Sequence, residues 1–171
     1  KNIRNKNTIN FIIGGPNKYF KFQQQTQEKI LNEIKFLSND FKVNVIPSRR
    51  TPRGLIEELS KIDNENIVTF DDLFNPRKYG ELLSMGNLQV VTWDSISMIS
   101  EAISSEAGTF LFKFEEKFCP KRYLKFFDKI TKLNLAKFYN QNLKPYEISI
   151  DEYNKNLKTK ILNKIQSNLR F

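Results

Sequence analysis

The sequence of 171 residues contains no histidine and one cysteine, and these absences exclude several kinds of catalytic site. Without histidine, the chain holds no serine–histidine triad and no histidine-ligated metal ion. Cys119 alone forms no internal disulfide and no cysteine zinc site. A general base is therefore an aspartate or a glutamate, or is supplied from outside this chain. We expect no metal and no cofactor.

Long apolar runs are also lacking, since no stretch approaches the length of a membrane span and no signal peptide is recognisable. Apolar residues make up 39% and charged residues 27%, which is ordinary for one soluble domain with a sizeable core. The first residue is Lys1, and the first predicted strand starts at Thr8. We therefore expect residues 1–171 to be a single domain of a longer cytoplasmic protein whose N-terminal domain is absent here.

The net charge of +9 comes mainly from lysines that are scattered along the chain. Nucleic-acid-binding proteins more often cluster positive charge on one face, so we do not expect a nucleic-acid partner. Arginine is scarce, and four of the seven arginines fall within residues 49–77. The planar guanidinium group suits phosphate or carboxylate, so this clustering indicates an anion site.

Residues 88–112 are the stretch that best defines the fold. Apolar runs at 88–92 and 109–112 are typical of strands, and apolar residues at helical spacing lie between them. Asp94 and Ser95 precede this helix as candidate N-cap residues. The pattern predicts a parallel βαβ unit.

The rest of the chain repeats this alternation of strands and helices. Further strands are predicted at residues 8–13, 42–46, 66–70 and 136–139, and helices at 23–37, 53–62, 77–85 and 150–170. Aromatic residues at helical spacing after residue 112 indicate a core stripe: Phe118, Tyr123, Phe126 and Phe127. The fold class is α/β, a three-layer Rossmann-like domain with a mainly parallel sheet of five or six strands.

Polar loops follow three of these strands, at the edge where open parallel sheets bind ligands. Gly14 and Gly15 follow the first strand, and such residues let a ligand approach the main chain closely. Arg49 and Arg50 follow the second strand, and Thr51 is a candidate cap for the next helix. This favours an anion site, although a pair of surface arginines with one in a salt bridge would look the same.

The helix after Asp94 carries Ser97 and Glu101 on its polar face. A carboxylate there can accept two hydrogen bonds from vicinal hydroxyls such as those of a ribose. The alternative is a capped helix whose polar face is simply solvated.

Four motifs together resemble a known family: GGPNKY at 14–19, SRRT at 48–51, NP at 75–76 and TWDSISMISEA at 92–102. In this order and spacing the chain is similar to the C-terminal half of the mitochondrial-fission ELM-like family, which is widespread in bacteria. That family is in turn similar to glycosyltransferases with two Rossmann domains (GT-B type), whose C-terminal domain binds the nucleotide-sugar donor.

The resemblance implies binding of a UDP- or GDP-type nucleotide diphosphate sugar and metal-independent glycosyl transfer by the full-length protein. The implied nucleotide and phosphate contacts are Gly14, Gly15, Pro16, Asn17, Lys18, Ser48, Arg49, Arg50 and Thr51. The implied base and ribose contacts are Asn75, Thr92, Asp94, Ser95, Ser97, Met98 and Glu101. This segment alone is not expected to be catalytic, and the identity of a catalytic base is unknown.

Two positions depart from the family pattern. Trp93 stands where a small residue is usual, and the sequence SEAGT at 105–109 is expected to bring Glu106 near the mouth of the site. The alternative function is a non-catalytic interaction module, peripheral on the inner membrane face. It would use the basic helix at 150–170 and the segment 113–127 as its contact surface.

Overall fold

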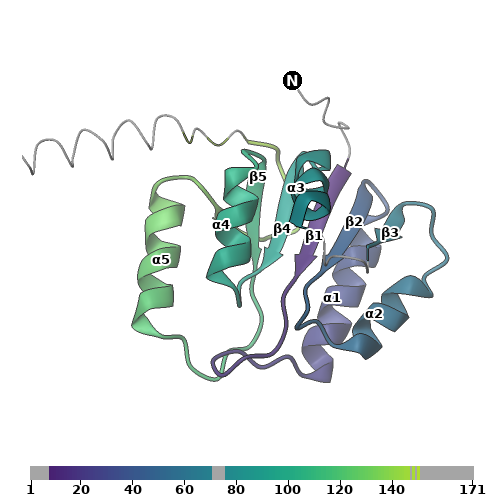
Figure 1. The fold of residues 1–171 in the computed structure, drawn as a ribbon, viewed down its shortest axis with the longest axis horizontal. Coiled ribbons are helices and arrows are strands. Elements are labelled where there is room, and N and C mark those ends of the chain that lie inside the picture. Colours follow the sequence, from purple (N-terminus) through teal and green to yellow (C-terminus); the bar gives the residue numbers. More distant parts are fainter. Residues whose placement is uncertain (1–7, 71–75, 147, 149, 151–171) are drawn as a thin grey trace, which may run out of the picture.

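The structure is a computed structural model that describes residues 8–70, 76–146, 148 and 150 (Figure 1). Its strands are β1 (Thr8–Ile13), β2 (Lys42–Pro47), β3 (Ile67–Thr69), β4 (Leu88–Thr92), β5 (Gly108–Phe112) and β6 (Lys137–Phe138). Its helices are α1 (Gln24–Leu37), α2 (Arg53–Ser60), α3 (Pro76–Met85), α4 (Ile96–Ser104) and α5 (Lys121–Lys132). Asn75 and residues 151–170 of the predicted last helix lie outside the described residues.

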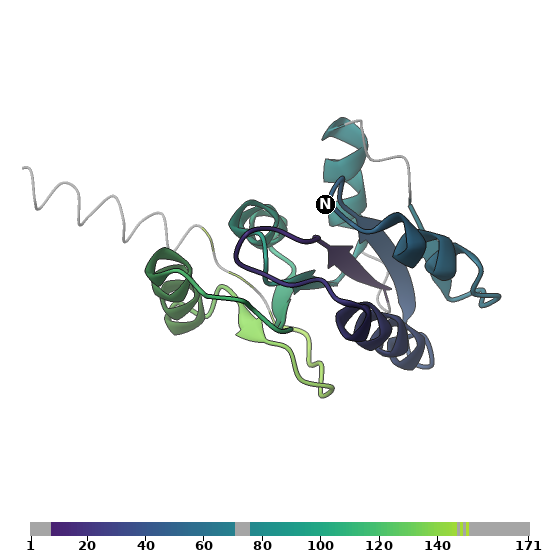
Figure 2. The ribbon, with the colours of Figure 1, turned by 90° about the horizontal axis from the view of Figure 1, so that it is seen from below.

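The six strands form one sheet in the order β3-β2-β1-β4-β5-β6, and all neighbouring strands pair in parallel. This is the order of the doubly wound dinucleotide-binding fold, with its switch point between β1 and β4. Right-handed crossovers place α1 and α2 on one face and α3, α4 and α5 on the other. Figure 2 shows α1 opposite α3 and α4 across the sheet. The predicted three-layer Rossmann-like fold is confirmed.

The strands form because apolar and β-branched residues fill them, and helices cover both of their faces. Every residue of β1, β4 and β5 is buried, as expected for parallel strands inside an α/β domain. The predicted aromatic stripe is confirmed at Tyr123 and Phe127, which are buried on α5. It is wrong at Phe118, which is 65% exposed because it precedes the helix.

Three buried amide side chains cross the centre of the sheet, and we refer to Asn10, Asn44 and Gln89 as the amide row. Asn10 accepts a hydrogen bond from Asn44 Nδ2 at 2.9 Å and donates one to Gln89 Oε1 at 3.1 Å. Asn10 Nδ2 also donates to the Leu82 carbonyl at 2.8 Å, and Gln89 Nε2 donates to the Leu83 carbonyl at 2.8 Å. The amide row therefore satisfies carbonyl groups in the last turn of α3 and fixes that helix on the sheet.

Candidate functional site at the carboxyl edge of the sheet

The loops that follow β1, β2 and β4 meet at one edge of the sheet, beside the switch point between β1 and β4. Figure 2 views this edge. Parallel strands bring their carboxyl ends together there, which is where ligands bind in open α/β sheets. The strand order therefore brings the three loops together, as predicted from the sequence.

Gly14 and Gly15 lie where the chain's own atoms leave no room for a side chain. Gly14 N donates to Thr92 Oγ1 at 2.7 Å, and Gly15 N donates to Asp94 Oδ2 at 3.1 Å. A Cβ atom at Gly14 would lie 2.2 Å from Asp94 Oδ2, and one at Gly15 would lie 2.0 Å from the Arg50 carbonyl oxygen. The sequence analysis expected a ligand to approach the main chain closely at these glycines. In the structure, Asp94 and the backbone of Arg50 make that close approach.

Arg50 joins these loops. Its Nη2 lies 2.9 Å from Asp94 Oδ2, and its Nη1 donates to the Gly15 carbonyl oxygen at 2.8 Å. The Arg50 side chain is 39% exposed, whereas the Asp94 side chain is fully buried. Arg50 is therefore held from inside the domain and still reaches solvent.

Asp94 is the buried centre of this arrangement. Burial raises the pKa of its carboxyl group above the ordinary value of 3.8, and Thr92, the Gly15 amide and Arg50 oppose that rise. Oδ1 of Asp94 has no hydrogen-bond partner among the described residues. The carboxylate thus faces the protein, so the structure does not show Asp94 as a direct ligand contact.

Thr51 and Asn17 fix the backbone of their loops. Thr51 Oγ1 donates toward the carbonyl oxygens of Ile13 and Gly14, at 2.9 and 2.7 Å, and accepts from Ser48 N at 2.8 Å. The prediction that Thr51 caps α2 is wrong, because that position belongs to Pro52 and no side chain caps the helix. Asn17 Nδ2 donates to the Asp94 carbonyl oxygen at 3.1 Å.

The helix α4 begins with Ser95 at its N-cap position, as predicted, but without a capping hydrogen bond from that side chain. Ser97 and Glu101 are exposed on this helix, and Met98 is half-buried. Glu101 lies near the hydroxyl group of Tyr79 on α3, and burial together with this carboxylate raises the Tyr79 pKa. Glu101 on α4 therefore lies beside Tyr79 of α3.

The remaining predicted contacts are divided between solvent and core. Pro16, Lys18 and Arg49 are exposed, and Thr92 is buried at the end of β4. The prediction that Glu106 lies near the mouth of the site is wrong. This residue follows α4 and precedes β5, so it lies at the amino ends of the strands, opposite the site. Its positive φ of 59° turns the chain there.

The groups exposed at this edge are of the kind that bind anions in other proteins. Arg49 and Arg50 supply guanidinium groups, and the first turn of α4 supplies unpaired backbone N–H groups. In the described part of the chain, no cluster of three His, Cys, Asp or Glu side chains could hold a metal ion.

A sequence model of the family described as Mitochondrial fission ELM1 matches residues 2–161. The chain belongs to this family. An uncharacterized protein of Rickettsia prowazekii (strain Madrid E) is 27% identical over 140 residues, which cover 77% of this chain and 38% of that protein. The chain thus spans well under half the length of this curated relative. None of the described helices is long and apolar enough to cross a membrane.

The sequence analysis did not predict that aromatic residues from three segments of the chain pack together beside the site. Phe20 follows the glycine loop, is fully buried, and packs edge-on against Trp93 with ring centroids 5.3 Å apart. Trp93 also stacks on Phe127 at 5.5 Å. The available signal was the aromatic character of the loop after β1, which holds Tyr19, Phe20 and Phe22, together with the large Trp93 directly after β4.

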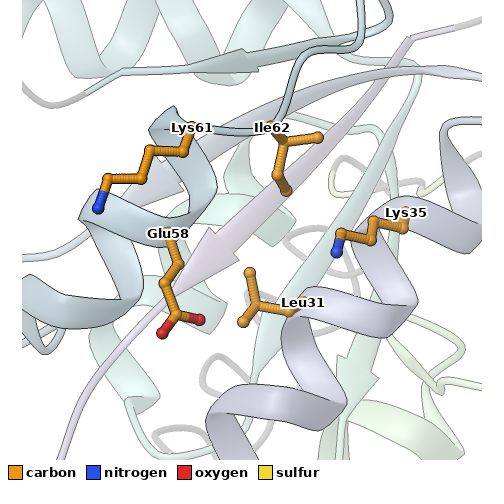
Figure 3. Close-up of a pocket in the computed structure, with 5 residues that line it drawn as sticks. All are labelled: Leu31, Lys35, Glu58, Lys61 and Ile62. Carbon is orange, nitrogen blue, oxygen red and sulfur yellow. The ribbon is translucent and has the colours of Figure 1, made fainter.

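A surface hollow of about 330 Å³ lies elsewhere, between α1 and α2 (Figure 3). Leu31 and Lys35 of α1 face Glu58, Lys61 and Ile62 at the end of α2. Because both helices end near the amino edge of the sheet, this hollow is remote from the predicted site, and none of the predicted contacts lines it.

Proposed function

We propose that this domain binds the diphosphate of a UDP- or GDP-type nucleotide sugar at the carboxyl edge of β1, β2 and β4. The observation that carries the proposal is the convergence of Gly15, Arg50 and the start of α4 at the switch point of a doubly wound sheet. A guanidinium group anchored beside a helix N-terminus suits a diphosphate.

Arg50 is preorganised for this task. A guanidinium group carries five N–H donors, and the bonds to Gly15 and Asp94 leave others for a bound anion. Because the buried carboxylate fixes the side chain in advance, less conformational entropy is lost when an anion binds. Asp94 then supports binding through Arg50 instead of touching the base or ribose, and exposed Arg49 adds a second cation.

The exposed polar face of α4 would receive the nucleoside. Ser97 and Glu101 lie one turn apart and face solvent, so Glu101 can accept hydrogen bonds from the two ribose hydroxyls. In the full-length protein, which we propose to be glycosyltransferase-like with two Rossmann domains, the arginines would stabilise the departing diphosphate without a metal ion.

Isothermal titration calorimetry with UDP, GDP and ADP tests the proposal. Arg49→Ala and Arg50→Ala should each weaken diphosphate binding by about 1.5–3 kcal/mol, the usual value for a charge-assisted hydrogen bond. Lys61→Ala, at the remote hollow, is the control and should bind as the wild type does. Absence of binding by every nucleotide, to this domain and to a full-length relative, would refute the proposal.

A second candidate function is an interaction module at an anionic membrane surface. The observation that favours it is the outer face of α5, where Lys121, Lys125 and Leu124 are exposed, with Phe118 exposed just before the helix. Basic side chains beside exposed apolar ones suit a membrane surface with anionic lipids.

Co-sedimentation with vesicles that contain phosphatidylserine, at physiological salt, distinguishes the two functions. The membrane candidate predicts binding that Lys121→Glu together with Lys125→Glu abolishes. Absence of the wild-type protein from the vesicle pellet would eliminate this candidate and leave nucleotide binding unaffected.

A further inference from the structure

The carboxyl ends of β4 and β5 are covered by the chain itself. Residues 14–23 leave β1, pass across this edge toward α5 and return to the start of α1 (Figure 2). The segment that follows β5 meets this loop, and Phe20 forms an isolated antiparallel bridge with Glu116. Two distant parts of the sequence therefore close over the same half of the sheet edge.

Backbone hydrogen bonds hold the loop in this position. The Tyr19 carbonyl oxygen accepts from Lys117 N at 2.7 Å and from Phe118 N at 3.2 Å. Asn17 Oδ1 accepts from the amides of Tyr19 and Phe20 at 2.8 and 3.0 Å. The loop is thus tied both to its own turn and to the segment after β5.

Aromatic rings fill the space beneath the loop. Phe20 lies 5.3 Å from Trp93, 5.5 Å from Tyr123 and 6.0 Å from Phe114, measured between ring centroids. Trp93 is 3% exposed, and its Nε1 donates to the Phe114 carbonyl oxygen at 3.0 Å. We refer to Phe20, Trp93, Phe114 and Tyr123 as the aromatic cover.

A dinucleotide bound to a doubly wound sheet crosses the switch point and places one nucleotide over each half of the carboxyl edge. In this chain the half beyond β4 is occupied by the aromatic cover. The loop after β2 and the first turn of α4 retain exposed polar side chains, including Arg49 and Ser97. One half of the usual binding surface therefore remains open.

We propose that the aromatic cover is a specificity element that restricts this site to a ligand with a single nucleotide and excludes dinucleotides. The binding of that single nucleotide rests on the proposed function above, whereas the exclusion rests on the packing of Phe20 and Trp93. The large side chain of Trp93, packed against Phe20, fills the space at the end of β4.

Paired ligands test the exclusion by calorimetry: UDP with diuridine diphosphate, GDP with diguanosine diphosphate, and ADP with NAD⁺. Each pair shares one nucleoside diphosphate, and the second member adds a nucleoside. The expected result is that the second nucleoside brings no gain in affinity. A gain of about tenfold, equivalent to about 1.4 kcal/mol, would show that it finds a place on the sheet and would overturn the proposal.

Trp93 reports on the cover independently of ligand binding, because it is the only tryptophan in the sequence. Acrylamide should quench its fluorescence far less in the native protein than in the unfolded chain, with or without UDP. Equal quenching in both states would overturn the proposal even if no nucleotide binds. Failure of all nucleotides to bind, with Trp93 protected, would instead refute the proposed function and leave the cover in place.

Phe20→Ala removes the central ring and is expected to raise acrylamide quenching of Trp93 several-fold. Phe20→Leu keeps more of the packing and replaces the alanine variant if that variant fails to fold. It should raise acrylamide quenching of Trp93 by a smaller factor than is expected for Phe20→Ala. Phe36→Ala, on α1 where the side chain is 43% exposed, is the control and should leave quenching unchanged. Quenching that Phe20→Ala and Phe20→Leu leave at the wild-type value would show that Phe20 does not maintain the cover.

Discussion

Replacement of Asp94 is the most direct test of how the candidate site is held together. Asp94→Ala leaves the buried Gly15 N–H without its acceptor, which costs about 1–3 kcal/mol of stability. It also removes the partner of Arg50, but this side chain is 39% exposed and can be solvated, so the lost ion pair adds only about 0–1 kcal/mol. The expected total loss is about 1–4 kcal/mol.

Asp94→Asn separates the hydrogen bonds from the charge. The asparagine oxygen can still accept from Gly15 N, and its amide would occupy the place of Oδ1, which lacks a partner in the described structure. Since burial raises the Asp94 pKa, the charged form is disfavoured in the fold, and its removal costs little. We expect Asp94→Asn to lose less than about 1 kcal/mol at pH 7.

The raised pKa also sets the direction of the pH dependence. Between the unfolded value near 3.8 and the raised native value, the native state binds more protons than the unfolded state. The stabilisation linked to Asp94 protonation is therefore fully present below the unfolded pKa and is lost as pH rises through the native pKa. Relative to Asp94→Asn, the wild type should gain stability as the pH falls toward 4.

Urea unfolding of the three proteins, followed by circular dichroism at several pH values, measures these differences. A loss of stability in Asp94→Asn as large as that in Asp94→Ala at pH 7 would refute the separate roles of hydrogen bonding and charge. A wild type that loses stability relative to Asp94→Asn on acidification would indicate a lowered native pKa and would refute the predicted pH dependence.

Substitutions at Thr51, Gly15 and Asn10, with matched controls, test individual contacts by the same unfolding assay. Thr51→Val deletes the hydroxyl that joins the first two loops and should cost about 1–3 kcal/mol, whereas Thr51→Ser keeps the hydroxyl and should cost less. Gly15→Ala should destabilise the fold, because its Cβ would lie 2.0 Å from the Arg50 carbonyl oxygen. Gly54→Ala, in open space on α2, should instead stabilise it by about 0.4–1 kcal/mol. Asn10→Leu should cost at least about 1–3 kcal/mol, because it leaves buried partners of the amide row unpaired. A variant as stable as the wild type would show that the amide row does not stabilise the fold.

Much of the fold could be predicted because strands and helices differ in the period of their apolar residues. Several bounds shifted by one residue, and larger shifts fall where local signals are weak: β3 shortens to Ile67–Thr69, and α2 ends at Ser60. The short strand β6 was also predicted from its residues and pairs with β5. The amide row was not predicted, because polar residues in a strand reveal their partners only when the pairing register is known.

The site was predicted as a set of loops and not as a set of contacts. Gly15, Arg50 and Asp94 do come together as expected, yet they bind one another. From the sequence, each of these three residues was predicted to contact a ligand directly. Their mutual bonds depend on the spacing between β1, β2 and β4, which no local pattern encodes.

The sequence by itself determined the α/β class, the family and the loops that carry polar chemistry, because these follow from residue periodicity and local motifs. Only the tertiary structure decided which side chains remain available to a ligand. Parallel pairing places the ends of β1 and β4 side by side, so the carboxylate of Asp94 turns inward to Gly15 and Arg50. The same pairing lets Phe20 cover Trp93. These two residues are 73 positions apart in the chain, and they meet only because the strands that precede them, β1 and β4, are neighbours.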